Sequence, residues 1–587
     1  VVKIELWTPS WEEKMLVGGA MTAQRLLKCK TNLAVYSKLS EKQPDLVAAF
    51  WKYLLVCFET PRPSTDYKEP NDPHRLDQIR KILSTCATSV GATAEEDEAG
   101  NLIIRKEGKG TGVGKPWLCL QGHLDMVCSE NSVVGHDFEK DPIEVRFSSD
   151  DGMTDGWLKP VKATSLGADN GIALAAGLAV METLPNHPPL ELLCTANEET
   201  DFHGAEGVKG DSLKAKTLLN LDSEEEYSIC VGCAGGFEHS YKLPYEALPI
   251  DPDWAIVNVN LSGFHGGHSG VDIDKEYGNA IKSLARILLS TGQTCRLLDC
   301  QGGTGPNSIP REASCVIALP RAELENFETS LQSAFDEVKA ELKSTDPDAT
   351  LSISACAASV TNTVPPDVPP IPTGEPPRKA AKGVLVGGLW RCSRCPKCQA
   401  AAIAEGEDGS DKAGKSLKVP STALSASDTT KVWKFLALVP HGVLRKSTEV
   451  EDLVESSVCC SMLALREDHL FCHLFLRSSV TSYMKYGQRM LSAYGDLAGA
   501  ENVENQVPFP AWQPCMESPL LALCKKTHVE VFRKEPKVYA VHAGLECGIL
   551  KERKPELDCC SIGPWICNAH SPDERVHIES GARFVKW

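Results

Sequence analysis

The chain has 587 residues, of which 42% are hydrophobic and 24% are charged, as in an ordinary globular protein. This length exceeds what one hydrophobic core normally organises, so we expect at least two domains. The formal net charge of −18 argues against nucleic acid as a partner, because nucleic-acid binding usually needs a basic face. No apolar run approaches the length of a membrane span, and the N-terminus lacks the pattern of a secretory signal, so no membrane partner is expected.

The first predicted elements alternate between helix and strand. Residues 1–40 carry no clear pattern except a short helix expected near residues 21–27, whereas residues 46–54 and 76–83 have apolar positions at helical spacing. Strand-like apolar runs follow at residues 102–105, 117–120, 190–195 and 217–221, with a helix rich in small residues at 170–184. This alternation predicts an α/β domain in which helices flank a mixed, largely parallel sheet.

A second block begins after residue 236. Residues 255–261 and 313–319 are predicted strands, and an amphipathic helix is expected at residues 280–289, so this block is typical of an α+β domain. Residues 364–430 interrupt it with the segments VPPDVPPIPTGEPP and AEGEDGSDKAGKS, whose composition predicts a disordered insert. We expect ordered structure to resume near Val432.

The 24 cysteines lack the regular spacing of small disulfide-bonded domains. Reduced thiols and a cytoplasmic location are therefore the preferred interpretation. Cys392, Cys395 and Cys398 form a short cluster at which a metal could bind, but a fourth ligand is not obvious and the flanking sequence resembles a linker. An incidental, exposed cluster is the simpler interpretation.

Acidic and imidazole side chains follow the ends of three predicted strands: His123, Asp125, Glu198, Glu199 and Asp222. Asp169 precedes the small-residue helix. Functional groups gather at the carboxyl ends of strands in parallel α/β sheets, so these side chains can converge. Imidazole and carboxylate ligands together suit zinc, manganese or cobalt.

Each of these residues also has an ordinary interpretation. A single His-x-Asp sequence is common by chance, and Glu198 and Glu199 could belong to a solvated turn. Asp169 could cap the following helix, and Asp222 could begin an exposed acidic loop. Their shared position at strand ends nevertheless favours one metal site.

Several ordered motifs carry a resemblance to a known family. They are GHLDMV, TSLGADNGIALAAGLAVME, ANEETDFHGAEGV, NLDSEEE, VGCAGG, FHGGHSGVDID, PNSIP, VPHGV, LRSS, HAGLECG and HSPDE. These motifs resemble the aminoacyl-histidine dipeptidases, which are cocatalytic dinuclear-zinc peptidases. The resemblance covers the chain from about residue 42 to its end, apart from the 364–430 insert.

The resemblance implies a metal-activated water and two Zn²⁺ per subunit, for which Mn²⁺ or Co²⁺ can substitute. It assigns five metal ligands, of which Asp169 bridges both ions: His123, Asp169, Glu199, Asp222 and His570. It makes Glu198 the general base, with Asp125 orienting His123. His268 becomes the oxyanion donor, Asn307 and Arg477 hold the substrate carboxylate, and Gly544 belongs to the pocket wall.

The implied function is hydrolysis of dipeptides with a free N-terminus, both Xaa-His and other Xaa-Xaa dipeptides, by a homodimer. The expected domains are an extension at 1–40, a catalytic domain from 41–236 and 501–587, and an inserted α+β lid and dimerisation domain at 237–500. Whether His268 serves its own subunit or the neighbouring one stays open. The alternatives are a related dinuclear-zinc aminoacylase or tripeptidase, and a zinc-binding adaptor with an inactive peptidase core.

Overall fold

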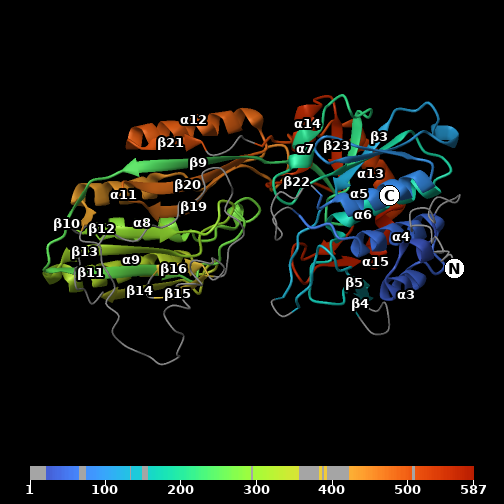
Figure 1. Ribbon diagram of the computed structural model, residues 1–587. Helices are drawn as coiled ribbons and strands as arrows, with labels where there is room; N and C mark the ends of the chain where they lie inside the picture. Colours follow the sequence, from blue (N-terminus) through green and yellow to red (C-terminus); the bar gives the residue numbers. More distant parts are fainter. Residues whose placement is uncertain are drawn as a thin grey trace, which may run out of the picture. The chain divides into compact units, whose positions relative to one another are not determined.

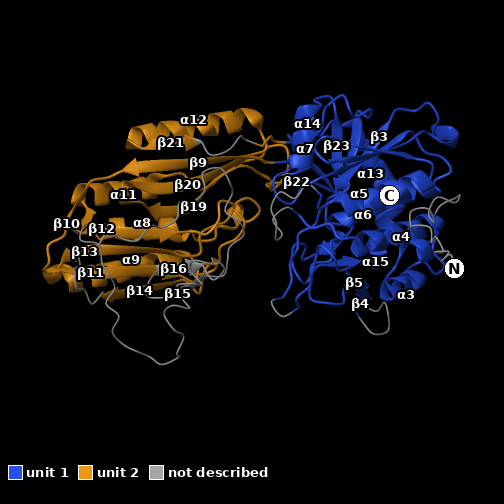
Figure 2. Ribbon diagram, in the orientation of Figure 1, with its two compact units in different colours: residues 1–233, 512–540, 545–587 blue, residues 234–511, 541–544 orange. Residues whose placement is uncertain are grey.

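The computed structural model describes residues 21–64, 74–131, 134–148, 156–291, 295–355, 383–386, 389–392, 422–504 and 509–587 (Figure 1). The chain divides into two compact units, which Figure 2 colours separately. Unit 1 comprises residues 1–233, 512–540 and 545–587, and unit 2 comprises residues 234–511 and 541–544. Each unit is therefore assembled from segments that lie far apart in the sequence.

Unit 1 is built on an eight-stranded sheet with the order β1-β2-β6-β3-β7-β23-β8-β22. The strands are β1 Thr93–Glu96, β2 Leu102–Lys106, β3 Leu118–His123, β6 Leu190–Thr195, β7 Thr217–Asn220, β8 Ser228–Cys233, β22 Lys537–Val541 and β23 Asp558–Ser561. Strands β6, β3, β7 and β23 pair in parallel, whereas β1, β2 and β8 join the sheet through antiparallel pairs. The predicted mixed α/β sheet is confirmed, with its parallel part at the centre.

Helix α6 (Ala168–Thr183) packs on this sheet. It contacts β3 and β6, and it packs against α4 (Asp45–Glu59). A Cβ atom at Gly177 would lie 2.6 Å from the side chain of Leu192, so only glycine allows α6 to approach β6 this closely. Gly177 is therefore needed for the close packing of α6 on β6.

The remaining elements of unit 1 complete its core. The helices are α2 Ala23–Leu26, α3 Lys30–Leu39, α5 Asp77–Ser89, η1 Gly110–Gly112, α7 His203–Gly207, α13 Pro519–Phe532, α14 Glu546–Arg553 and α15 Ile578–Phe584. A second sheet has the order β24-β25-β5-β4, with β4 Val145–Phe147, β5 Trp157–Pro160, β24 Ile566–Cys567 and β25 Arg575–His577. Met21, Leu26 and Val35 are buried in the core, although the sequence predicted only a short helix in this region.

Unit 2 is built on a nine-stranded antiparallel sheet with the order β14-β11-β13-β12-β19-β20-β9-β21, in which β18 also pairs with β19. The strands are β9 Gly235–Pro244, β11 Trp254–Ser262, β12 Arg296–Gly302, β13 Ala313–Pro320, β14 Thr350–Ala355, β18 Gly442–Lys446, β19 Val454–Leu465, β20 His469–Ser478 and β21 Glu501–Glu504. The helices are η2 Ile273–Lys275, α8 Ala280–Ser290, η3 Arg321–Glu323, α9 Leu324–Glu341, α11 Ala426–Leu438 and α12 Thr481–Ala498.

The strand order of unit 2 contains the same βαββαβ motif twice. One copy is β11-α8-β12-β13-α9-β14, and the other is β9-α11-β19-β20-α12-β21, with the first copy inserted after β9. The two copies have mirrored strand orders and meet through the antiparallel pair β12 and β19. One continuous sheet therefore joins the two similar halves of unit 2.

The prediction of disorder over residues 364–430 is wrong at its C-terminal end. Strand β17 (Thr422–Leu424) pairs with β10 (Ala247–Pro249), and α11 begins at Ala426 rather than near Val432. The Ser425 side chain caps α11 by accepting a hydrogen bond from the Asp428 N–H at 3.0 Å. The polar composition of this segment predicted disorder, so the start of the helix was not recognised from the sequence.

Within the same insert, β15 (Gly383–Val386) and β16 (Leu389–Cys392) form an antiparallel pair. Cys395 and Cys398 of the predicted cysteine cluster lie outside the described residues.

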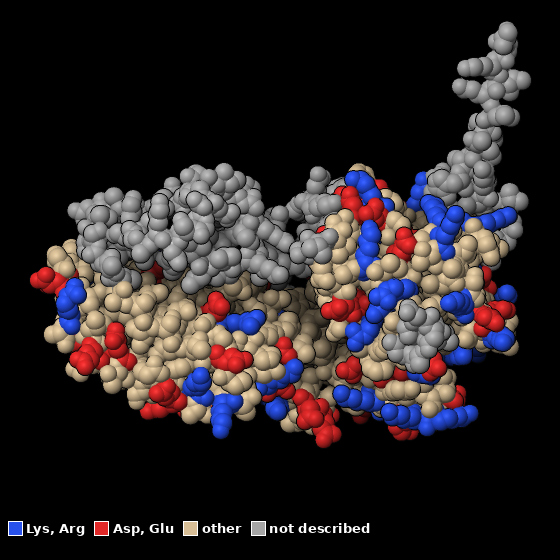
Figure 3. Space-filling model, turned by 90° about the horizontal axis from the view of Figure 1, so that it is seen from below, with Lys and Arg blue, Asp and Glu red and all other residues tan. Residues whose placement is uncertain are grey.

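The surface charge and the helix composition can be compared with the expectations from the bulk composition. On the face shown in Figure 3, acidic and basic side chains are interspersed over the described residues, without an extended basic area. Among these residues, no helix combines the length and the apolar character that crossing a membrane requires.

Candidate metal centre

The predicted metal ligands lie at the carboxyl edge of the central sheet in unit 1. His123 is the last residue of β3, which extends three residues beyond the strand end expected at Leu120, and it lies beside Thr195 of β6 in the parallel register. Asp222 is the second residue after the end of β7. The parallel pairing of these strands brings their carboxyl ends to the same edge.

The structure brings five predicted ligands together in two overlapping groups. The ligand atoms of His123, Asp169 and Asp222 lie within 4.8 Å of one another, and so do those of Asp169, Glu199 and His570. His123 Nε2 is 3.0 Å from Asp169 Oδ1 and 3.5 Å from Asp222 Oδ1. His570 Nε2 is 3.0 Å from Asp169 Oδ2 and 3.1 Å from Glu199 Oε2. Asp169 therefore belongs to both groups and uses a different oxygen in each.

Burial and charge perturb these groups strongly. Burial and the neighbouring Asp169 raise the pKa of Glu199 to about 7, and burial is also the main cause that raises the pKa of Glu198 well above its usual range. Burial opposes ionisation of Asp169, but hydrogen bonds from His123 and His570 lower its pKa. Burial would lower the pKa of His570, yet its two carboxylate partners raise it to about 11. Carboxylates are crowded here beyond what the two imidazoles neutralise.

The cluster fits a bound cation. Glu199 Oε1 and Asp222 Oδ1 are buried and have no hydrogen-bond partner, although buried carboxylate oxygens normally accept hydrogen bonds. Two imidazoles and three carboxylates form a donor set that suits zinc, manganese or cobalt. A divalent cation would supply the missing partners and offset the repulsion between the carboxylates.

Asp125 connects both parts of the cluster. Its Oδ1 accepts a hydrogen bond from the Glu198 N–H at 3.1 Å, and its Oδ2 accepts one from the Glu199 N–H at 3.3 Å. His123 Nδ1 lies 3.4 Å from the same Oδ1 and 3.0 Å from the Asp125 carbonyl oxygen. The structure therefore adds a contact that sequence did not suggest, because Asp125 also holds the backbone of both glutamates.

A buried polar network beneath the ligands was missed by the sequence analysis. Glu546 Oε2 accepts hydrogen bonds from Gln121 Nε2 at 2.6 Å and from Thr195 Oγ1 at 2.7 Å, and Gln121 accepts one from Asn220 Nδ2 at 2.6 Å. Burial raises the pKa of Glu546 to about 8. The sequence carries one sign of this network, because the apolar strands LCLQGH and TLLN contain the polar residues Gln121 and Asn220.

The other predicted residues belong to unit 2, where His268 and Arg477 lie side by side. His268 Nδ1 accepts hydrogen bonds from the N–H groups of Gly270 and Val271 at 3.2 and 3.0 Å, which places the ring proton on Nε2. This Nε2 lies 3.4 Å from Arg477 Nη2. Two hydrogen-bond donors therefore converge, an arrangement that fits an anion.

Arg477 is a buried cation without an acidic partner. Its side chain contacts Ser269 Oγ and the ring of Phe475, and the described residues place no carboxylate within ion-pair distance. Burial lowers the pKa of Arg477 to about 10, and burial together with Arg477 lowers the pKa of His268 to about 4. At neutral pH the pair is thus a guanidinium cation beside a neutral imidazole.

Asn307 and Gly544 lie in the same unit. The Asn307 carbonyl accepts a hydrogen bond from the Ser269 N–H at 2.8 Å, which ties Asn307 to the His268 loop. A Cβ atom at Gly544 would lie 2.9 Å from the Phe509 ring, so the chain passes this ring too closely for a side chain.

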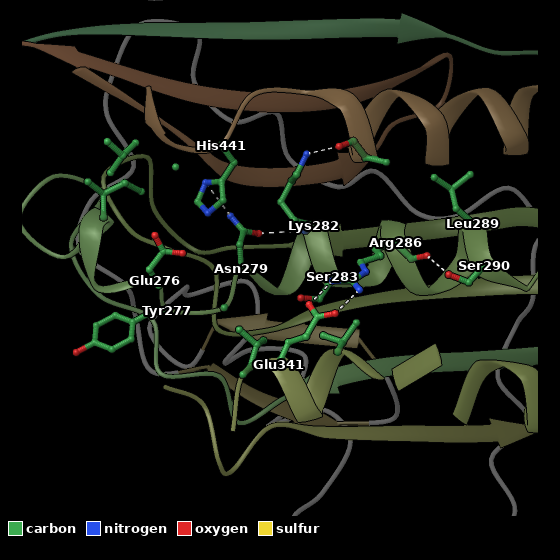
Figure 4. A pocket seen from close by; sticks show the side chains of 17 residues that line it. Glu276, Tyr277, Asn279, Lys282, Ser283, Arg286, Leu289, Ser290, Glu341 and His441 are labelled. Carbon is green, nitrogen blue, oxygen red and sulfur yellow. Dashed lines mark hydrogen bonds and ion pairs between the residues drawn. The ribbon is translucent and has the colours of Figure 1, made fainter. Parts of the chain in front are cut away.

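Unit 2 also contains a cavity of about 620 Å³ beside α8 and α9 (Figure 4). The Lys282 ammonium donates hydrogen bonds to the carbonyls of residues 436, 437 and 439, and Arg286 pairs with both carboxylate oxygens of Glu341. Burial and Lys282 lower the pKa of His441, which also lines the cavity, to about 4. The charged groups of Lys282, Arg286 and Glu341 in this wall thus have partners within the protein.

Known proteins resemble this chain in sequence. Residues 259–346 match the family described as peptidase dimerisation domain. The cytosol non-specific dipeptidase of Escherichia coli (strain K12) is 32% identical over 551 residues, which cover 93% of this chain and 97% of that protein. This chain belongs to the M20 dipeptidase family.

A solved structure of the M20 dipeptidase family has the same fold. The aminoacylhistidine dipeptidase from Vibrio alginolyticus superposes with a TM-score of 0.72 and 28% identity, over 94% of this chain and 96% of that one. Membership in the M20 family and the ligand cluster together indicate a metal cofactor.

Proposed function

We propose that this chain is a metal-dependent dipeptidase that hydrolyses dipeptides with a free N-terminus, including Xaa-His dipeptides. The observation that carries the proposal is the cluster of five ligands sharing Asp169, in a chain that is 32% identical to a cytosol non-specific dipeptidase. We expect the enzyme to act on dipeptides in the cytoplasm.

Two Zn²⁺ ions fit the two overlapping ligand groups, and Mn²⁺ or Co²⁺ can substitute. His123, Asp169 and Asp222 would hold one ion, and Asp169, Glu199 and His570 would hold the other. The ions would supply Lewis-acid activation of the attacking water and of the scissile carbonyl. Glu199 Oε1 and Asp222 Oδ1, which lack hydrogen-bond partners in the protein, support this assignment.

Glu198 is the proposed general base. It would take the proton of the attacking water and later deliver it to the leaving amine. Its carboxylate can approach His123 and Glu199, and Asp125 holds its backbone N–H at 3.1 Å. Asp125 therefore orients the base as well as His123.

Arg477 and Asn307 are proposed to hold the C-terminal carboxylate of the substrate. A buried guanidinium without an acidic partner is costly, and a substrate carboxylate would remove that cost. His268 would donate its Nε2 proton to the developing oxyanion. Gly544 would leave space at the pocket wall. We expect a homodimer, and His268 and Arg477 would act in their own subunit or in the partner subunit.

One experiment tests this function against its alternatives. The purified protein is given dipeptides, tripeptides and N-acyl amino acids, before and after removal of metal with a chelator. We expect hydrolysis of dipeptides only, loss of activity without metal, and recovery with Zn²⁺, Mn²⁺ or Co²⁺. Preferred hydrolysis of N-acyl amino acids or tripeptides would favour an aminoacylase or a tripeptidase, and full activity after metal removal would exclude the proposal.

A further inference from the structure

The segment that carries Asp169, residues 165–169, is held by a carboxylate from the far end of the chain. Glu574 Oε2 accepts hydrogen bonds from the N–H groups of Leu166 at 2.6 Å and Gly167 at 2.9 Å. Its Oε1 accepts one from the Asp169 N–H at 3.3 Å. Glu574 is only 2% exposed, so these bonds are shielded from water.

A buried cation holds the same segment through its carbonyl groups. Arg62 Nη2 donates a hydrogen bond to the Gly167 carbonyl, and Nη1 donates to the carbonyls of Asp125 at 2.7 Å and Leu124 at 3.1 Å. The φ angle of Gly167 is +74°, and a Cβ atom there would lie 2.7 Å from Arg62 Nη2. A side chain at residue 167 would thus push Arg62 away.

These contacts connect three segments that contribute metal ligands. Arg62 links the Asp169 segment to the residues just after His123, and Glu574 links it to the part of the chain that follows His570. Gly167 donates its N–H to Glu574 and accepts from Arg62 through its carbonyl, so charged groups hold its peptide units from both directions. Neither charged group is itself a member of the ligand groups.

We propose that Arg62 and Glu574 form a backbone clamp that positions Asp169 for binding metal in both ligand groups. This inference rests on the proposed metal-dependent function and adds two positioning residues to it. Both residues act through the backbone, and neither touches the substrate.

Both carboxylate oxygens of Glu574 are what the clamp requires. Three backbone N–H donors point at these two oxygens, which act only as acceptors. Glutamine would replace one acceptor oxygen with an NH₂ group that opposes a backbone N–H. Residues that orient metal ligands typically change metal affinity by about 10- to 100-fold when they are replaced.

The test uses Glu574→Gln, Glu574→Asp and Arg62→Lys in the full-length protein, with Zn²⁺ affinity measured by competition with a chromophoric chelator. Glu191→Gln is the matched control, because Glu191 is a buried carboxylate that also accepts backbone N–H bonds, from Lys214 and Ala215, at 3.1 and 2.8 Å. Arg296→Lys is the control for Arg62, since Arg296 also donates to backbone carbonyls, those of residues 248, 249, 423 and 424.

We expect Glu574→Gln to weaken Zn²⁺ binding by about 10- to 100-fold. Arg62→Lys and Glu574→Asp should have smaller effects in the same direction, since each keeps its charge. Both controls should bind Zn²⁺ as the wild type does, even where they lower the melting temperature. In the metal-free protein, hydrogen exchange of a peptide covering residues 165–169 should accelerate in Glu574→Gln and not in Glu191→Gln.

The outcomes separate the clamp from the proposed function. Unchanged Zn²⁺ affinity in Glu574→Gln and Arg62→Lys would overturn the clamp while the wild type still binds metal. Failure of the wild type to bind Zn²⁺ would overturn the metal-dependent function itself. If Glu574→Gln does not fold, Glu574→Asp takes its place in the test. Wild-type Zn²⁺ affinity in both Glu574→Asp and Arg62→Lys would then overturn the clamp.

Discussion

The polar clusters of unit 1 and unit 2 lack opposite kinds of partner. The first has an excess of acceptors, and the second has an excess of donors. Around Asp169, carboxylate oxygens outnumber the donors, and two buried oxygens lack a hydrogen-bond partner. Around Arg477, donors converge, and the described residues bring no acid to the guanidinium. The first cluster therefore needs a cation and the second needs an anion.

Under the proposed function, the two clusters contribute differently to peptide hydrolysis. A cation-binding cluster without an anion site would hydrolyse amides with little selection at the C-terminus. An anion site alone would bind carboxylates without cleaving anything. Variants in the first cluster should mainly reduce the rate, whereas variants at Arg477 should mainly change which substrates bind.

The largest expected effect is in the unit 1 cluster. Glu198→Ala should lower kcat by about a thousandfold or more, because it removes both proton transfers, while bound metal is retained. His123→Ala should instead lower metal occupancy. Metal analysis by mass spectrometry and dipeptide hydrolysis distinguish the two, and the exposed Glu206→Ala on α7 is the control. Equal metal loss in both variants would mean that the roles of base and ligand are wrongly assigned.

The next effect concerns the His268 donor. His268→Ala should lower kcat by about a hundredfold, the typical loss of one oxyanion donor, and KM should change much less. His265→Ala is the control, since His265 lies in the same loop but stacks on Tyr277. Steady-state kinetics of both variants test this, and a normal kcat in His268→Ala would return the histidine to an ordinary loop role.

The subunit in which His268 acts can be tested by mixing variants. Hybrid dimers of His268→Ala with Glu198→Ala should regain activity if His268 reaches the partner's site. They should stay inactive if each subunit is self-contained.

A smaller effect is expected for Arg477→Met. Loss of a charge-assisted hydrogen bond costs about 1.5–3 kcal/mol, so KM for dipeptides should rise about 10- to 100-fold. A dipeptide with an amidated C-terminus supplies the internal control, because it should bind the wild type weakly and the variant no worse. If Arg477→Met still prefers the free carboxylate as the wild type does, Arg477 is not the anion site.

The smallest effect lies outside both clusters. Ser425→Ala removes the cap of α11 and should reduce the free energy of unfolding by about 1 kcal/mol, with kcat/KM unchanged. Urea denaturation of this variant is compared with that of Thr430→Ala, an exposed change on the same helix. A drop in activity without a drop in stability would instead connect α11 to the catalytic site.

The sequence predicted the metal ligands around Asp169 better than it predicted the residues that hold those ligands in place. Parallel strands end at a common edge, so residues that follow them, such as His123 and Asp222, can be expected to converge. Family resemblance supplied His570, which no local pattern connects to β3. Side chains that hold backbone atoms of distant segments leave no such pattern. Arg62 and Glu574 each contact residues more than 60 positions away, and neither was singled out for a role.

The prediction of disorder in unit 2 failed at the end of the insert, because composition alone does not reveal tertiary contacts. Residues 422–430 have the polar, small composition of a linker, yet they form β17 and the start of α11. Tertiary contacts decide this: the Leu297 N–H donates a hydrogen bond to Thr429 Oγ1 at 2.9 Å, and β17 pairs with β10. Such pairing between distant segments cannot be inferred from local propensity.

The mirrored repeat of unit 2 restricts how this protein can self-associate. The matched dimerisation domain, residues 259–346, lies within the β11-to-β14 copy, and the edge of its β12 is already occupied by β19 of the same chain. A neighbouring molecule cannot add a strand where these two strands pair. Along this sheet path the described terminal strands are β14 and β21, and their outer edges can take part in intermolecular strand pairing. The pair of β12 and β19 is a seam between the two copies inside one chain.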